Sequence, residues 1–262
     1  MSARRTPSAL AAAAVLFVAL AAAAGAASGA VQAQPASRAS AAPLVQTMVV
    51  GSSGAVLAAA RAVTAASASV RVGHRSCTVA SGTPLAVLAA LRRLGGPSFT
   101  LHDYGHCGGS ATNSGQLFVN SLAGEPNRGQ SGWEYKVGGV SGSTGAADPS
   151  GPAGDGRRLR AGAQLLWFYC RASGGGCQRS LEVAAPARIA PGVSLVVRVL
   201  GRDNEGRSAP VAGAIVKLGS DFASTAADGR ATLLAPQAPG RYTLGATRNG
   251  LVPSFPATVT IA

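Results

Sequence analysis

The apolar positions of this chain follow two patterns, and the change between them falls near residue 180. Before that point, one stretch of helical periodicity stands among segments that alternate apolar and polar residues, as half-buried strands do. After it, short alternating stretches follow one another, separated by turn residues. The pattern predicts an α+β domain over residues 68–180, with one helix on a β-grasp-like mixed sheet, and an all-β sandwich over residues 181–262.

The predicted helix has signals at both ends. Thr83 is a favourable N-cap, Pro84 suits the first turn, and Gly95-Gly96 follows the last turn. Leucines recur on one side of this segment, at Leu85, Leu88, Leu91 and Leu94. We therefore expect a helix that lies with its leucine side on the sheet.

The stretch SGWEYKVGGV, residues 131–140, predicts a strand that ends in a tight turn. Alternation gives it a buried face with Trp133, Tyr135 and Val137, and a solvated face with Glu134 and Lys136. Aromatic rings at this spacing belong more often to a core than to a ligand cage. Gly138-Gly139 can supply the positive φ angles of a hairpin turn, but the long Gly-rich loop that follows argues against an immediate return strand.

Residues 164–170 predict the last strand of the first domain. Its apolar residues occupy both faces, with Leu165, Trp167 and Tyr169 on one side and Leu166 and Phe168 on the other. A strand of this kind is central in its sheet and covered on both sides.

The N-terminal part predicts export. Arg4 and Arg5 precede an apolar run, and small residues follow it, so residues 1–33 are typical of a signal peptide. The run could also stay uncut as a membrane anchor. Residues 34–67 are rich in Pro, Ala and Ser at first and then apolar without a clear period, and we expect a disordered or weakly structured lead-in. The role of residues 46–66 stays open.

Four cysteines remain after the signal segment. In an exported protein an even number indicates disulfides, and four cysteines allow three pairings. Cys170 and Cys177 flank a flexible Gly-rich turn, so we expect Cys170 to pair with Cys177 and Cys77 with Cys107. A metal site is the alternative, because His74, His102 and His106 lie close to Cys77 and Cys107 in the sequence.

The chain is basic, with a formal charge of +13 that falls to +11 without the signal segment. Its arginines are mostly scattered, and the one cluster is Arg157-Arg158-Leu159-Arg160. A solvated basic surface is the simpler interpretation, and attraction to anionic wall polymers or lipid headgroups is the alternative. We expect a monomer that binds no nucleic acid, and membrane contact only through an uncleaved signal segment.

A resemblance makes the first domain more specific. The stretch GQLFVNSLAGEPNRGQSGWEYKVGGV, with LRAGAQLLWFYC further on, resembles the transcobalamin-like C-terminal domain family of bacterial surface proteins. The resemblance covers residues 68–180 and implies a structural motif of Trp133, Tyr135, Val137, Gly138, Gly139, Gly162, Trp167 and Tyr169. The family's usual Asn-Gly turn is Gly138-Gly139 here, which keeps the turn chemistry. Its usual Gly-Asp is Gly162-Ala163, so any role of that acid is absent.

The second domain resembles carboxypeptidase-regulatory-like and bacterial Ig-like surface modules. The segments PVAGAIVKL, TAADGRATL and APGRYTLGATRNGLVPS carry this resemblance, with an Ala-Asp-Gly turn and a Pro-Gly-x-Tyr strand start. Expected strands cover residues 195–201, 214–219, 222–226, 230–234, 241–247 and 257–261. Such modules act mostly as spacers or adhesion units, and the fold itself does not identify a ligand.

Signals for catalysis are weak. The chain has no Gly-x-Ser-x-Gly, His-Glu-x-x-His or phosphate-loop motif. His102-Asp103 with Ser110 could suggest a dyad, but neighbouring strand residues point to opposite faces. Asp148 and Asp155 could hold calcium, although a solvated loop explains them more simply.

These observations predict a non-catalytic protein, exported to the cell surface or secreted, that needs no cofactor and binds an unknown extracellular ligand or a cell-envelope component. The loops 108–115 and 138–156 are the expected binding regions. A corrinoid-like small-molecule binder is one alternative, although the chain has no large helical domain of the kind that cobalamin carriers use. An enzyme of an unrecognised type is the other.

Overall fold

The structure is a computed structural model that describes residues 41–262. The predicted signal peptide, residues 1–33, lies outside the described residues. Strands are the main regular structure of the described chain, which contains a single α-helix, α1, Pro84–Arg93. We refer to residues 43–178 as the helical lobe and to residues 180–262 as the strand lobe. The mostly β architecture agrees with the predicted combination of an α+β part and a β-sandwich.

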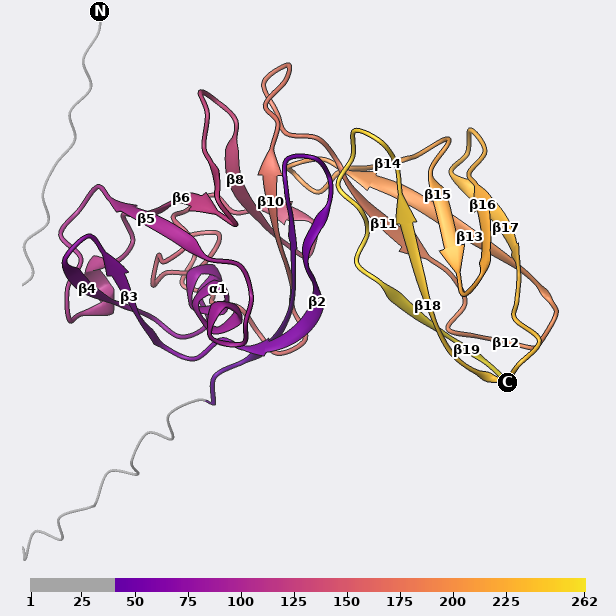
Figure 1. The fold of residues 1–262 in the computed structure, drawn as a ribbon, viewed down its shortest axis with the longest axis horizontal. Coiled ribbons are helices and arrows are strands. Elements are labelled where there is room, and N and C mark those ends of the chain that lie inside the picture. Colours follow the sequence, from indigo (N-terminus) through magenta and orange to yellow (C-terminus); the bar gives the residue numbers. More distant parts are fainter. Residues whose placement is uncertain (1–40) are drawn as a thin grey trace, which may run out of the picture. The chain divides into compact units, whose positions relative to one another are not determined.

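The helical lobe is built on a five-stranded sheet (Figure 1). Its strands, in spatial order, are β2 (Val56–Thr64), β1 (Leu44–Val50), β10 (Gln164–Cys170), β8 (Gly132–Val137) and β9 (Val140–Ser141). Strand β1 runs parallel to β10, and the other neighbouring pairs are antiparallel. The first and the last long strands of the lobe are therefore central neighbours.

The prediction of a weakly structured lead-in is wrong for residues 44–64. Val45 and Val49 of β1 have no exposed surface, and both lie in the main core of the lobe. The pairing of β1 with β2 shifts register near Val49, and alanine is the commonest residue of β2, at four of its nine positions. Because small side chains on an irregular edge strand give no clean alternation, the sequence pattern did not reveal this hairpin.

Helix α1 packs its apolar side into the same core. Leu85, Leu88 and Leu91 are buried as predicted, whereas Leu94 lies beyond the helix and is 53% exposed. The Thr83 hydroxyl caps the first turn by accepting a hydrogen bond from the backbone N–H of Ala86 at 3.3 Å. The predicted start and end signals of the helix are thus confirmed.

The rest of the helical lobe consists of a hairpin and a small three-stranded sheet. The hairpin pairs β3 (Ala68–Val72) with β4 (Arg75–Val79). The small sheet has the order β5 (Phe99–Asp103), β6 (Leu117–Leu122) and β7 (Glu125–Pro126). A one-turn 3-10 helix, Ala111–Asn113, precedes β6.

The turn after β8 is tighter than the sequence suggested. Gly138 and Gly139 have φ angles of 58° and 89°, and Val137 pairs directly with Val140. A two-residue turn with two positive φ angles requires glycine-like residues, which the Gly-Gly pair supplies. Contrary to expectation, a return strand, β9, follows at once, although it is only two residues long.

The strand lobe is a sandwich of two sheets. One sheet contains β11 (Ser180–Ala184), β13 (Ser194–Arg202), β14 (Ser208–Pro210) and β17 (Arg230–Leu234). The other has the order β12 (Arg188–Ile189), β19 (Ala257–Ile261), β18 (Gly240–Thr247), β15 (Ile215–Leu218) and β16 (Asp221–Ser224). Inward-facing residues of both sheets form one apolar core. The six predicted strands are present, and β11, β12 and β14 are additional.

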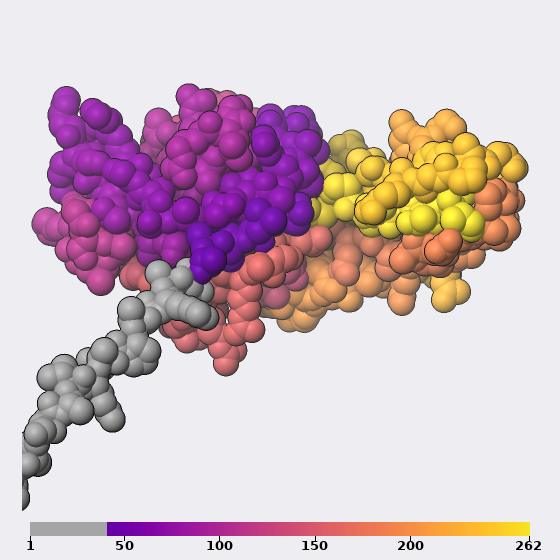
Figure 2. Space-filling model, turned by 90° about the horizontal axis from the view of Figure 1, so that it is seen from below, coloured from indigo at the N-terminus to yellow at the C-terminus, as the bar shows by residue number. Residues whose placement is uncertain are grey.

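A third apolar cluster joins the two lobes. Met48 and Phe168, on the sheet face opposite α1, pack with Val252 and Phe255 of the strand lobe. Figure 2 shows the indigo surface of the β1–β2 hairpin beside the yellow surface of the C-terminal residues. Strand β10 is therefore central and covered on both faces, as its sequence predicted.

Candidate functional site

The aromatic residues of the GWEYKV strand lie in the core. Trp133 and Tyr135 are each 5% exposed. Across the β8–β10 pair, Trp133 faces Tyr169 and Tyr135 faces Trp167, with ring centroids 5.6 and 5.5 Å apart. Edge-to-face and tilted ring pairs at this distance stabilise a core beyond simple area burial. These rings hold the fold together, as the alternation predicted.

Backbone carbonyl oxygens accept hydrogen bonds from the polar atoms of three of these side chains. Trp133 Nε1 donates to the carbonyl oxygen of Glu125 at 2.7 Å, and the hydroxyl groups of Tyr135 and Tyr169 donate to other carbonyls at 2.9 and 3.1 Å. Trp167 Nε1 is buried and has no hydrogen-bond partner among residues 41–262. Because the rings and nearly all their polar atoms are occupied internally, this strand presents no aromatic surface to a ligand.

Lys136 does not point to solvent, so the prediction of a solvated second face is wrong at this position. Its side chain is 1% exposed, because the strand lobe covers it. The ammonium group donates to Ser180 Oγ at 3.4 Å and to the carbonyl oxygens of Arg202 and Asp203 at 3.2 and 3.0 Å. It also lies 5.4 Å from the centre of the Phe168 ring.

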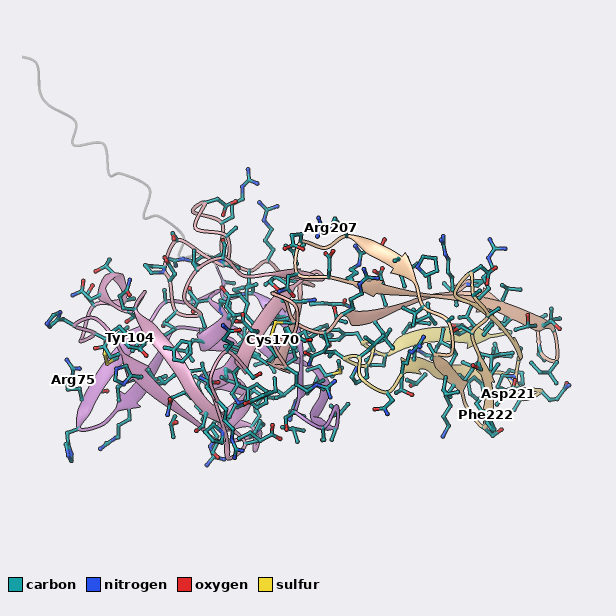
Figure 3. The ribbon with its side chains drawn as sticks, turned by 90° about the horizontal axis from the view of Figure 1, so that it is seen from above. Arg75, Tyr104, Cys170, Arg207, Asp221 and Phe222 are labelled. Atoms are coloured by element: carbon teal, nitrogen blue, oxygen red, sulfur yellow. A yellow bond between two sulfur atoms is a disulfide. The ribbon has the colours of Figure 1, made fainter. Side chains whose placement is uncertain are left out.

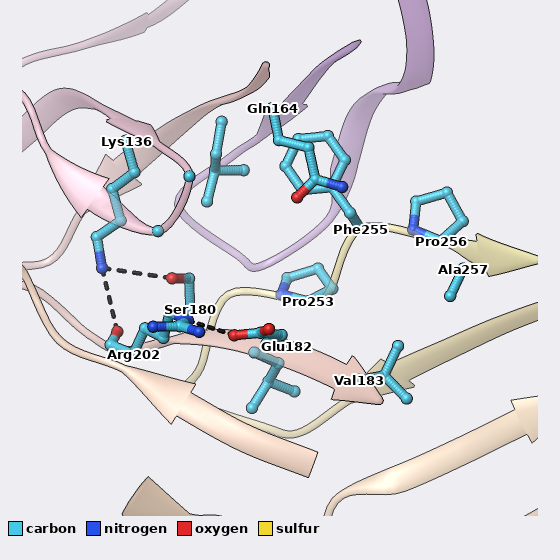
Figure 4. Close-up of a pocket in the computed structure, with 14 residues that line it drawn as sticks. Lys136, Gln164, Ser180, Glu182, Val183, Arg202, Pro253, Phe255, Pro256 and Ala257 are labelled. Carbon is cyan, nitrogen blue, oxygen red and sulfur yellow. Dashed lines mark hydrogen bonds and ion pairs between the residues drawn. The ribbon is translucent and has the colours of Figure 1, made fainter. Parts of the chain in front are cut away.

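The Lys136 side chain lines a cavity of about 260 Å³ between the lobes (Figure 4). Arg202, which also lines this cavity, forms an ion pair with Glu182. Burial lowers the pKa of Lys136 to about 8, although the negative charges of Asp203 and Glu205 oppose the shift. Three donors meet three acceptors at this ammonium group. These three hydrogen bonds join the helical lobe to the strand lobe, so the role that the geometry supports for Lys136 is structural.

The residues that could suggest a catalytic dyad are separated. The Asp103 carboxylate accepts hydrogen bonds from the N–H groups of Gly105 and Cys107 at 2.9 and 3.0 Å, and Arg75 pairs with it at 3.1 Å. Burial by itself would raise the pKa of Asp103, but these donors and the guanidinium hold it below its usual value. His102 occupies the opposite face.

The His102 ring packs with Tyr104, at a centroid distance of 4.3 Å. Figure 3 marks Tyr104 and Arg75 at this end of the helical lobe. Ser110, the serine suggested to act with the dyad, caps the 3-10 helix, because its Oγ accepts a hydrogen bond from Thr112 N. Each of the three side chains thus has a partner other than the two with which it would act.

Both predicted disulfides are present. Cys77 pairs with Cys107 and Cys170 with Cys177, with Cα atoms 5.3 and 5.0 Å apart. Bonded cysteines offer no thiolate to a metal, and within residues 41–262 no three His, Cys, Asp or Glu side chains gather as a metal site. Two disulfides indicate an oxidising environment outside the cytoplasm. None of the helices in this part of the chain has the length and apolar character that a membrane crossing needs.

The two loops expected to bind a ligand have different surroundings. In the loop 108–115, Gly108 O accepts a hydrogen bond from Thr78 N at 2.8 Å, and Ser114 is buried against the same strand. The loop 138–156 instead lines one wall of a surface groove of about 330 Å³. We call this second feature the arginine groove.

The lining of the arginine groove contains both apolar and basic residues. Val137, Val140 and Leu159 are among the apolar ones, and all three arginines of the predicted cluster, Arg157, Arg158 and Arg160, belong to the lining. Asp155 is the one acid among the lining residues, so the lining carries three positive charges and one negative charge. Arg158 Nε donates a hydrogen bond to the carbonyl oxygen of Pro149 at 2.8 Å, which joins the arginine cluster to the loop 138–156.

The loop that lines the arginine groove is held in place by internal hydrogen bonds. Thr144 Oγ1 donates to the carbonyl oxygen of Gly151 at 2.7 Å, and Asp148 accepts from Ser150 N at 2.8 Å. Gly151 has a φ of 91°, and a Cβ there would lie only 2.0 Å from Arg157 O. The loop backbone can approach the arginine segment this closely only with glycine at that position.

The sequence predicted the arginine cluster and the binding loop 138–156 as separate features. It did not predict the burial of Lys136 or the groove itself. The one signal in the sequence that could have indicated the groove is that the loop and the arginine cluster both follow the GWEYKV strand closely along the chain. Comparison with protein-family models, with curated proteins and with solved structures finds no match to this chain. The two family resemblances therefore rest on the residues alone.

Proposed function

We propose that this is an exported, non-catalytic binding protein that holds an acidic partner, at the cell surface or in the medium, in the arginine groove. One observation carries the proposal: Arg157, Arg158 and Arg160 line one groove together with residues of the loop 138–156 and with apolar side chains. Guanidinium groups bind carboxylates and phosphates through paired hydrogen bonds. Apolar surface beside them excludes water and strengthens those contacts.

We also propose that the helical lobe is a β-grasp-like domain of the transcobalamin-like type. In a β-grasp arrangement, a hairpin is followed by a helix, and the last strand lies parallel to the first. Strands β1 and β2, helix α1 and strand β10 follow that order, and Gln46 to Val50 pair in parallel with Gln164 to Phe168. The strand lobe would be an Ig-like or carboxypeptidase-regulatory-like module that supports the binding lobe.

The partner that fits best is an extended polyanion. The groove is open at the surface, and the exposed residues Arg157 and Arg160 belong to its lining, although Arg157 Nε also lies 3.7 Å from the Asp155 carboxylate. Anionic wall polymers with repeating phosphates would place one charge after another along this groove. Such binding weakens with salt, because exposed charges are screened over about 8–10 Å at physiological ionic strength.

The test is calorimetric titration of the protein, without its first 33 residues, with poly(glycerol phosphate) and with polyglutamate. A triple variant, Arg157→Gln, Arg158→Gln and Arg160→Gln, should bind about tenfold or more weakly, which corresponds to about 1.4 kcal/mol. Titration with cobalamin in the same buffer addresses the small-molecule alternative.

A control must separate the groove from the general charge of the protein. Without its first 33 residues the protein holds 21 basic residues (23 less Arg4 and Arg5) and 10 acids, which leaves +11. The control removes three charges from exposed positions of the strand lobe, at Arg188, Arg241 and Arg248. If both triple variants lose affinity equally, net charge explains the binding and the groove proposal fails.

A further inference from the structure

A second groove, with a different chemistry, lies between the β1–β2 hairpin and the outer face of the strand lobe. Its volume is about 840 Å³, within the range of pockets that hold small molecules. One wall comes from Val56 and Ala60 of β2, and the other from the sheet that contains β15, β16 and β18. We call it the apolar groove. It shares no lining residue with the arginine groove.

Large apolar side chains are exposed along this groove. Val56 and Ile215 are 47% and 44% exposed, and Phe222 is 69% exposed. Figure 3 marks Phe222 on β16, next to Asp221. Neighbouring apolar side chains from separate strands, left open to water in a concave surface, mark a binding site more often than isolated ones do.

The charge in the groove is confined to one residue. Lys217 is the one ionisable side chain among the lining residues, and no acid accompanies it. It lies on β15 directly opposite Phe222 of β16, and opposite Gly245 of β18 on its other side. One ammonium group on an otherwise apolar wall complements a ligand with one negative charge and a long apolar part.

Gly245 keeps the floor of the groove open. A Cβ placed at Gly245 would meet no atom within 4 Å, and its φ is not in the left-handed region. The fold thus does not require glycine there for backbone conformation or for close packing. Its effect is to leave free space beside Lys217, between the two walls.

From these observations, we propose that the apolar groove binds a monomeric anionic amphiphile, a free long-chain carboxylate. The acyl chain would lie between Val56 and the ring of Phe222, along Ile215, and the carboxylate would lie at the Lys217 ammonium. A bilayer is a poorer occupant, because the exposed apolar groups line a hollow between two walls and do not project from a convex surface.

The test uses dansyl-labelled undecanoate with the protein that lacks its first 33 residues. Fluorescence should rise on binding, and unlabelled dodecanoate should displace the probe about threefold to fivefold more strongly than dodecanol does, as one partly exposed ion pair allows. Lys217→Met should remove this preference and keep dodecanol binding. Lys217→Arg should retain it.

Gly245→Phe should abolish probe binding by filling the floor. Ser208→Phe, at an exposed position of β14 outside the groove, is the matched control and should bind like the parent protein. If Gly245→Phe does not unfold cooperatively, the comparison of carboxylate with alcohol in the Lys217 variants decides the question. Equal displacement by dodecanoate and dodecanol from the parent protein would overturn the proposal. So would co-sedimentation with phosphatidylglycerol vesicles without binding of the monomeric probe.

Discussion

The ammonium nitrogen of Lys136 lies 3.0 Å from the carbonyl oxygen of Asp203, and this contact joins a strand of the helical lobe to the end of β13 in the strand lobe. The two residues are 67 positions apart. A basic residue of the GWEYKV strand is thus part of the contact between lobes, and its burial has a measurable effect on stability.

We predict that the free energy of unfolding rises between pH 8 and 9.5 because of Lys136. Burial lowers the pKa of Lys136 from 10.5 to about 8 in the folded protein. Above pH 8 the unfolded chain therefore binds more protons at this residue than the folded protein does, so stability increases with pH; below pH 8 this contribution is constant. Urea unfolding at several pH values measures the slope.

The Lys136→Met variant should lose this slope, whatever its absolute stability. Lys217→Met, at an exposed lysine, is the control and should keep the slope of the parent protein. A Lys136→Met variant with an unchanged slope would show that the ammonium group is solvated, against the structure.

Trp133→Ala should destabilise the protein by about 3–5 kcal/mol, because it removes a large buried ring and leaves a cavity next to Tyr169. Phe222→Ala, at a ring that is 69% exposed, should change stability by less than about 0.5 kcal/mol. Chemical unfolding of the three proteins tests this. Loss of ligand binding at parental stability in Trp133→Ala would restore the ligand-cage interpretation.

The two disulfides should contribute unequally. The Cys77–Cys107 bond joins residues 30 positions apart, and the Cys170–Cys177 bond joins residues 7 apart. By loop-closure entropy, replacing the first pair with alanine should cost about 3.6 kcal/mol and replacing the second about 2.4 kcal/mol. Unfolding of the two double variants measures the difference, and the reverse order would contradict the entropic account.

A chain that begins at residue 68 should fail to fold, because β1 lies between β2 and β10 and supplies Val45 and Val49 to the core. A chain that begins at residue 41 should unfold cooperatively, since it keeps both strands. Circular dichroism during heating distinguishes the two. Cooperative unfolding of the shorter chain would show that the hairpin is dispensable.

Local signals in the sequence were sufficient for much of the fold. Thr83 and Pro84 marked the helix start, alternation identified the faces of Trp133 and Tyr135, and the two cysteine pairs followed from parity and spacing. Apart from the Cys77–Cys107 pair, which followed by elimination once Cys170 was assigned to Cys177, each of these features depends on residues close together in the chain. Their physical causes are therefore visible without the rest of the molecule.

The missed features depend on distant segments. Alternation placed Lys136 on a second face, but it could not show that Val252 and Phe255, more than a hundred residues later, cover that face. The arginine cluster was visible, yet its meeting with the loop 138–156 arises from tertiary packing. The sequence did not predict strand β2, because alanine occurs at both buried and exposed positions and therefore gives no clear alternation.

The apolar cluster between the lobes has a consequence for how such a chain can be rearranged. Met48, Leu166 and Phe168 would face water if residues 180–262 were cut away, because Val252 and Phe255 would leave with them. At that boundary each lobe covers apolar side chains of the other, so neither has a fully polar surface there. A gene fusion that carried only one lobe would expose these apolar residues to water. We therefore expect the two lobes to be transferred between genes together.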